Sequence, residues 1–182
     1  MRKLVFSMNV SLDGCADHRV ALADDELHDF ATRLLETEDM LLFGRGIYQL
    51  FVDYWPHARQ DPQATTSMLA FADRINAIPK VVFSSTLEKV DWSNTRLVGT
   101  DMLAEVKRLK QEAGGRLAVG GLRMIQSCWQ AGLIDEYWLL VHPLLWGPGR
   151  RLFENVPNAA AGELVDVSTF RSGVAVLHYA IH

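Results

Sequence analysis

The sequence is poor in the residues that mark membrane-embedded, nucleic-acid-binding and disulfide-rich proteins. Its 182 residues include only two cysteines, and 18 lysines and arginines are outnumbered by 22 aspartates and glutamates, for a net charge of −4. A surface that binds nucleic acid or an anionic membrane needs a basic field, so the charge balance argues against both partners. No apolar run approaches the roughly 18 residues of a membrane-spanning helix.

Features of export and of metal binding are also missing. MRKLVFSMNV begins with basic residues, but its apolar part is short and soon interrupted by Asn9 and Ser11, so we expect a first strand there and not a signal peptide. Cys15 and Cys128 form no metal-type pair. A single disulfide between them is an alternative, but two reduced thiols in a cytoplasmic protein are the expectation.

The six histidines show no pair at helical ligand spacing with a third ligand nearby, so we expect no metal site. We interpret His142, which precedes Pro143, as a packed strand residue.

What is present is enough apolar sequence for a full core. Hydrophobic residues make up 49% of the chain, and the length favours one domain, 1–182. Segments with strand periodicity alternate with segments of helix periodicity, and the tail has two strand patterns joined near Ser172-Gly173. Before the tail, the strand-like segments are 4–8, 40–44, 80–85, 116–119 and 137–145; the helix-like segments are 24–35, 45–51, 65–76, 100–113 and 122–131; and 56–62 is expected to be a surface loop.

This order predicts an α/β fold with three αβα layers: a mostly parallel central sheet, helices on both faces and an antiparallel C-terminal hairpin. In such open sheets a ligand sits at the carboxyl ends of the strands. Three marked segments fall at such ends: Gly44-Arg45, Ser84-Ser85-Thr86 and Gly120-Gly121.

Each segment has an ordinary alternative. Gly120-Gly121 leaves bare backbone where a phosphate could approach the start of a helix, but a tight turn explains it equally well. Arg45 offers a fork for phosphate oxygens or is a plain surface arginine. Ser84, Ser85 and Thr86 are common turn and cap residues. Taken together, the three segments indicate an extended anionic ligand across the sheet edge, such as a dinucleotide.

These residues carry a resemblance to the dihydrofolate reductase-like superfamily. LLFGRGIY resembles the glycine-arginine helix start of dihydrofolate reductases, and KVVFSSTL resembles their strand beside the adenosine end of the cofactor. GGRLAVGGLRMIQSCWQAGLIDEYWLLVHPLLWGPGRRLF resembles more closely the reductase domain of bacterial riboflavin biosynthesis. The chain is therefore similar to a stand-alone C-terminal reductase domain of the bifunctional riboflavin deaminase-reductases. The zinc deaminase signature of those enzymes is missing from this sequence.

The resemblance implies NADPH as hydride donor and reduction of 5-amino-6-(5-phosphoribosylamino)uracil. A pterin or dihydrofolate-type reductase is one alternative, and a nucleotide-binding protein of the same fold without turnover is another. Superfamily members often carry an arginine where this chain has Ser85, so we expect only a modest preference for NADPH over NADH. The implied cofactor contacts are Gly44, Arg45, Ser84, Ser85, Thr86, Gly120, Gly121, Leu122 and Arg123.

The resemblance also implies a catalytic and a substrate side. Asp13 and Gly14 would border the nicotinamide and the substrate, and Glu26 would match the carboxylate that protonates a pterin, with Asp25 or Asp29 adjacent. Acidic residues at a helix start also simply suit the helix dipole. Tyr54 and Trp55 would wall a substrate pocket or pack in a corner of the core. WGPGRRLF would close over the site or buttress it, and WLLVHPLLW with the last strand would form a homodimer interface.

Overall fold

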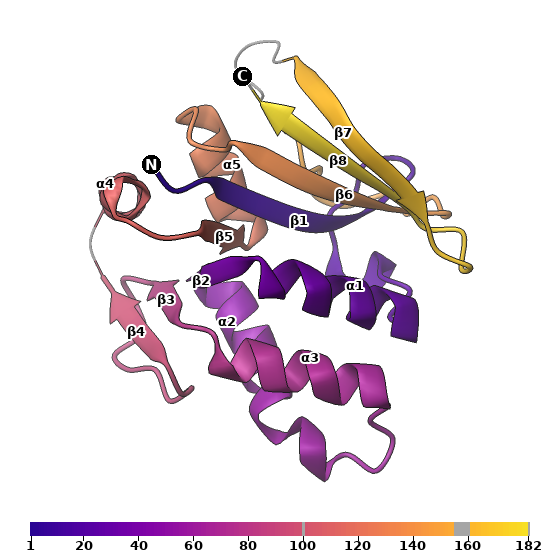
Figure 1. Cartoon of the computed structure of the whole chain (residues 1–182), viewed down its shortest axis with the longest axis horizontal. Coiled ribbons are helices and arrows are strands. Elements are labelled where there is room, and N and C mark those ends of the chain that lie inside the picture. Colours follow the sequence, from indigo (N-terminus) through magenta and orange to yellow (C-terminus); the bar gives the residue numbers. More distant parts are fainter. Residues whose placement is uncertain (100, 155–160, 182) are drawn as a thin grey trace.

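One sheet organises the molecule. The computed structural model describes residues 1–99, 101–154 and 161–181, and within these residues eight strands form one sheet in the order β4-β3-β2-β5-β1-β6-β8-β7 (Figure 1). The strands are β1 (Leu4–Ser11), β2 (Glu38–Gly44), β3 (Lys80–Phe83), β4 (Thr95–Val98), β5 (Arg116–Gly120), β6 (Glu136–His142), β7 (Gly162–Thr169) and β8 (Ala175–Ile181). The first six run parallel, and β7 and β8 form the antiparallel hairpin that the sequence predicts. The predicted fold class is confirmed.

Helices cover both faces of the sheet. α1 (Asp25–Glu36), α2 (Arg45–Val52) and α3 (Thr66–Ala77) pack on one face, through a core that includes Val5, Leu41 and Val82. α4 (Met102–Gln111) and α5 (Leu122–Gln130) pack on the other, through a core that includes Leu4, Leu42 and Val119. Leu41 and Leu42 point into opposite cores, which is the period-two pattern of a strand buried on both faces.

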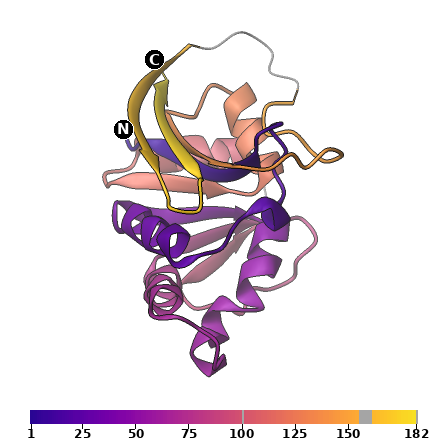
Figure 2. The ribbon, with the colours of Figure 1, turned by 90° about the vertical axis from the view of Figure 1, so that its right-hand side faces the viewer.

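The C-terminal hairpin extends past this helical cover (Figures 1 and 2). Every residue of β7 is exposed, and Leu164, Val165 and Val167 each expose about half of their surface. β7 is therefore an edge strand that presents apolar side chains to solvent.

Several predicted boundaries need correction. Within the predicted loop 56–62 the chain forms a 3-10 helix, η2 (Trp55–Gln60), which a proline in its first turn favours. The strand predicted over 137–145 ends at His142, because Pro143 has no N–H for a ladder. β3 ends at Phe83, because Ser84 Oγ accepts the N–H groups of Thr86 and Leu87 and turns the chain.

Strand β4 is missing from the sequence prediction, and a short 3-10 helix, η1 (His18–Val20), was also not predicted. Thr100, where the fourth helix was predicted to begin, lies outside the described residues. None of the described helices is long and apolar enough to cross a bilayer.

Candidate functional site

The parallel strands bring the three marked segments to one edge. Gly44 pairs in register with Phe83, so Ser84 follows β3 directly beside it, and Phe43 pairs with Gly120 on the other side. Residues far apart in sequence therefore line the carboxyl ends of β3, β2 and β5, as predicted.

Two helices start at this edge without a side-chain cap. α2 begins after Gly44 and α5 after Gly121, and neither glycine can cap the first-turn N–H groups. The other three described α-helices are capped by Asp24, Thr65 and Asp101. The first-turn amides of α2 and α5 have no intrahelical acceptor, and they carry the positive end of the helix dipole. Their arrangement suits a phosphate group.

Gly120 and Gly121, at the junction of β5 and α5, lack a side chain for different structural reasons. A Cβ on Gly120 would lie 3.0 Å from the Phe43 ring, so this position is small because Phe43 packs over it. Gly121 has φ of +102°, where L side chains are strained, and a Cβ there would lie 3.5 Å from Ile47 Cγ2 and 3.7 Å from the Gly44 nitrogen. A side chain at 121 would thus stand between the starts of α2 and α5.

Polar side chains surround these helix starts. Arg45 Nη1 donates to Thr86 Oγ1 at 2.8 Å, which links the start of α2 to the turn after β3. Ser85 and Arg123 are exposed, and Leu122 is half-buried in the first turn of α5. All the predicted cofactor residues lie at, or just after, the carboxyl ends of three adjacent strands.

Asp13 is held in a dense set of contacts. Its carboxylate accepts from Ser11 Oγ at 2.5 Å and from the N–H groups of Trp146 and Gly147 at 3.0 Å, and Arg151 Nη1 lies 3.0 Å away. The Ser11 hydroxyl and the Trp146 amide, with Gly147, hold the pKa of Asp13 well below its usual range. The group is a carboxylate at neutral pH and therefore has no proton to donate.

The same contacts fix the loop that contains WGPGRRLF. Leu12 N–H donates to Leu144 O, Ala16 N–H to Arg150 O, and Leu152 N–H to Gly14 O. Gly14 has φ of +79°, which lets the chain turn sharply between its partners. Residues 144–152 thus lie along residues 12–16 and buttress the end of β1.

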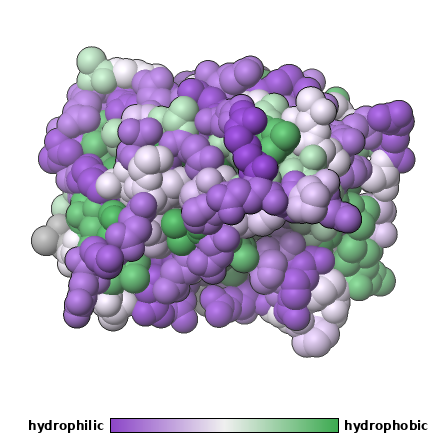
Figure 3. Space-filling model, turned by 90° about the horizontal axis from the view of Figure 1, so that it is seen from below, coloured by the Kyte–Doolittle hydropathy of each residue, from purple (hydrophilic) through white to green (hydrophobic). Residues whose placement is uncertain are grey.

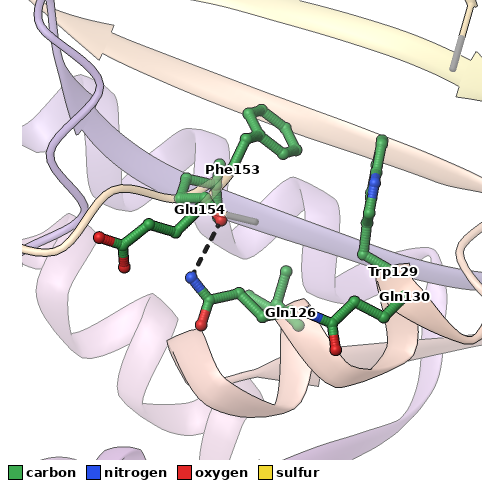
Figure 4. Close-up of a pocket in the computed structure, with 7 residues that line it drawn as sticks. Gln126, Trp129, Gln130, Phe153 and Glu154 are labelled. Atoms are coloured by element: carbon green, nitrogen blue, oxygen red, sulfur yellow. Dashed lines mark hydrogen bonds between the residues drawn. The ribbon is translucent and has the colours of Figure 1, made fainter. Parts of the chain in front are cut away.

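A small crevice lies on the other side of this loop, against α5 (Figure 4). Gln126 Nε2 donates to the carbonyls of Arg151 and Leu152, while Trp129 and Phe153 pack with ring centroids 5.0 Å apart. The crevice measures only about 10 Å³, which is room for no more than a water molecule. It anchors the loop and is too small for a cofactor or a substrate.

The remaining predicted residues lie elsewhere. Glu26 Oε2 accepts the N–H of Arg171 at 2.7 Å, so its carboxylate joins α1 to the turn of the hairpin. Tyr54 donates to Asp61 at 2.8 Å, and the Trp55 ring packs on Phe71 at 4.6 Å. These contacts favour the core-corner interpretation of Tyr54 and Trp55 over a substrate wall.

His142 has a larger structural role than the sequence suggested. It is fully buried, its Nδ1 accepts the Leu22 N–H at 3.1 Å, and its Nε2 lies 2.8 Å from Asn9 Oδ1. Since Nδ1 is the acceptor, we assign the proton to Nε2, which donates to Asn9. Burial lowers the pKa of His142. The neutral ring therefore ties β1, β6 and the segment before α1 together, which no spacing in the sequence reveals.

Among the described residues, no three His, Cys, Asp or Glu side chains converge as metal ligands. Cys15 and Cys128 are both buried, unpaired thiols.

Comparison with known proteins agrees with this architecture. The model of the RibD C-terminal domain family matches residues 2–176. The uncharacterized protein YyaP of Bacillus subtilis (strain 168) is 29% identical over 182 residues, covering 98% of this chain and 94% of that protein. YwjB of the same organism is 25% identical over 189 residues, covering 98% and 97%.

Two solved structures share the fold. One is a Shewanella sp. PV-4 protein provisionally assigned to riboflavin biosynthesis, with a TM-score of 0.72 at 20% identity over 100% of this chain and 99% of that chain. The other is a pyrimidine reductase-like protein from Corynebacterium diphtheriae, with a TM-score of 0.59 at 13% identity over 100% and 92%.

Proposed function

Because the chain belongs to the RibD C-terminal domain family, we propose that it is a reductase that uses NADPH to reduce a small heterocyclic substrate. The observation that carries the proposal is the pair of uncapped helix starts at Gly44 and Gly121, on neighbouring strands β2 and β5. They offer two anion-binding sets of amides side by side, which suits a pyrophosphate.

The residues present fit a nicotinamide dinucleotide. The left-handed Gly121 leaves open the space that a side chain would fill between the two helix starts. Arg45 with Thr86 and the hydroxyls of Ser84 and Ser85 would hold the adenosine phosphate end, and Gly120, Leu122 and Arg123 would border the pyrophosphate. The bound cofactor would supply the hydride, while the protein orients it and excludes water.

The substrate side is supported by the family alone. The 5-amino-6-(5-phosphoribosylamino)uracil reduction of riboflavin synthesis is the first candidate, and a pterin reduction is the second. Gly14 and the loop around Asp13 would form the wall beyond the nicotinamide. Asp13 would position that wall as a carboxylate and would not act as an acid.

One observation favours a second candidate function, nucleotide binding without turnover. Asp13, which would border the nicotinamide and the substrate, and Glu26, which would match the pterin-protonating carboxylate, both accept hydrogen bonds from the protein itself. In a reductase with this arrangement, the proton would come from solvent.

Loss of NADPH absorbance in the presence of ribitylaminouracils, ribosylaminouracil phosphates and pterins separates the two functions. Substrate-dependent oxidation with at least one of them supports the reductase. Tight nucleotide binding with no oxidation across the panel supports the non-catalytic alternative.

A further inference from the structure

A groove with a volume of about 390 Å³ lies between α1 and the end of β7 with the turn that follows it. Figure 1 shows that the hairpin turn reaches the N-terminal end of α1. The volume is in the range of small-molecule sites. None of the lining residues is among those assigned above to the cofactor. The residues that carry the argument are Glu26, Asp29, Phe30 and Arg33 on α1, and Phe170 and Arg171 on the hairpin side.

The walls of the groove are fixed by contacts of their own. The rings of Phe30 and Phe170 pack with centroids 5.8 Å apart. Glu26 Oε2 accepts the Arg171 N–H at 2.7 Å, and Glu26 Oε1 lies 3.5 Å from Arg171 Nε. Because both walls are joined in this way, the groove is formed without a ligand.

Two of its charged groups, Asp29 and Arg33, are available. The four α1 residues are spaced i, i+3, i+4 and i+7, so they share one side of the helix. Asp29 and Arg33 stand four residues apart, the spacing at which opposite charges usually pair on a helix. Both are exposed, and neither has a hydrogen bond or ion pair with another described residue. A carboxylate and a guanidinium group, neither with a partner among the described residues, therefore flank Phe30.

We propose that this groove binds a small zwitterion with a flat ring, the chemistry of a free aromatic amino acid. The ring lies on Phe30 and Phe170, the ammonium group meets Asp29, and the carboxylate meets Arg33 and Arg171. Aromatic rings pack favourably in offset-stacked and tilted arrangements, such as the one that Phe30 and Phe170 already make, and guanidinium groups bind carboxylates through paired donors. This proposal does not depend on the reductase activity.

Three probes that share one ring test it: L-phenylalanine, 3-phenylpropionate without the ammonium, and 2-phenylethylamine without the carboxylate. Binding is measured by calorimetry and by saturation-transfer NMR on the whole protein. We expect phenylalanine to bind about 5-fold more tightly than either fragment, as for an exposed ion pair worth about 1 kcal/mol.

Two variants test which protein side chain binds the ammonium group and which binds the carboxylate. Asp29→Asn should weaken phenylalanine and phenylethylamine about 5-fold and leave phenylpropionate unchanged, and Arg33→Gln should weaken phenylalanine and phenylpropionate and leave phenylethylamine unchanged. Lys107→Gln, which removes an exposed charge on α4, should change none of the three.

Gly121→Val separates this site from the proposed cofactor site, because it should retain phenylalanine binding whatever happens to nucleotide binding. The proposal is overturned if no probe binds at its solubility limit, if the three probes bind equally, or if neither charge variant changes their order.

Discussion

Asp13 and Arg151 meet across the base of the loop that follows β6, with Arg151 Nη1 3.0 Å from Asp13 Oδ2. The same carboxylate accepts the amides of Trp146 and Gly147. One side chain at the end of β1 thus organises a loop more than a hundred residues later, and the loop buttresses the edge where we place the nicotinamide.

Asp13→Asn should loosen this loop without unfolding the sheet. An amide keeps one acceptor oxygen but loses the charge, so it cannot serve both backbone amides, Ser11 and Arg151 together. We expect faster hydrogen exchange at the amides of Trp146 and Gly147, with exchange in β2 and β5 unchanged. Equal exchange rates in the variant and the wild type would show that the loop is held by its backbone pairing with residues 12–16.

The pH dependence of this contact has a defined sign. The pKa of Asp13 is lowered in the folded protein, so its stabilising contribution is complete above the ordinary aspartate pKa of about 4. It is lost only as the pH falls from there through the folded pKa. Protection of the Trp146 amide should therefore be constant from pH 8 to pH 5.

His142 should make stability fall in mild acid. Its pKa is lowered by burial, so the folded state resists a proton that the unfolded chain binds below about pH 6.5. The free energy of unfolding should therefore decrease as the pH falls from about 6.5 towards the folded pKa. His142→Gln should remove this part of the pH dependence, since the amide does not titrate.

Truncation of the His142 side chain tests whether it holds β1, β6 and the segment before α1 together. His142→Ala removes the hydrogen-bond partner of the Leu22 N–H and of Asn9 Oδ1 and opens a cavity in the core. We expect a loss of about 2–3 kcal/mol in urea unfolding at pH 7.5. A loss below about 0.5 kcal/mol would contradict the contacts described for the ring.

Cofactor preference follows from Ser85. A serine hydroxyl gives the 2′-phosphate of NADPH one hydrogen bond but no neutralising charge, while an arginine would add an ion pair with two parallel donors, a difference on the order of 1–2 kcal/mol or 5- to 30-fold. We expect a modest NADPH preference in the wild type, supported by Arg45, and a sharper one in Ser85→Arg through tighter NADPH binding. If the arginine does not tighten NADPH, the adenosine end lies away from the turn after β3.

We also propose a homodimer through the hairpin. The exposed Leu164, Val165 and Val167 lie on β7, the edge strand of the sheet that the described residues form, and Leu145, in the loop after β6, is 76% exposed. The face seen in Figure 3, from below Figure 1, is mainly hydrophilic with separate apolar patches. Light scattering should give twice the 20.4 kDa chain mass, and Val167→Lys should shift it towards the monomer. A wild-type monomer at micromolar concentration would remove the proposal.

The sequence predicted the layers well because periodicity records which faces are buried. Leu41 and Leu42 alternate between two cores, as do Leu4 and Val5, and Asp24 caps α1 where the predicted helix-like segment begins. It failed where local sequence carries little periodicity. β4 is four residues long and only partly buried, and nothing in its pattern distinguishes it from a loop.

The sequence predicted those parts of the site that the order of strands and helices brings together. It missed those parts that depend on tertiary contacts between side chains. Parallel strands bring Gly44, Ser84 and Gly120 to one edge by topology alone. The partners of Asp13 and Glu26, by contrast, are Arg151 and the amide of Arg171. Lys80 shows the same limit: it is 1% exposed, and its Nζ donates to the carbonyls of Ile75 and Ile78 at 2.7 Å, which no local pattern signals.

The central claim is that a nicotinamide nucleotide binds across the starts of α2 and α5, and calorimetric titration of NADPH into Gly121→Val tests it most directly. The matched control is Gly132→Val, just past the other end of α5, which also places a β-branched side chain at a positive φ (+62°) and has no atom within 4 Å of the new Cβ. We predict micromolar binding to the wild type and to the control, and no measurable binding to Gly121→Val although circular dichroism shows it folded. Equal NADPH affinity in all three folded proteins would contradict the account and return Gly120-Gly121 to a plain turn.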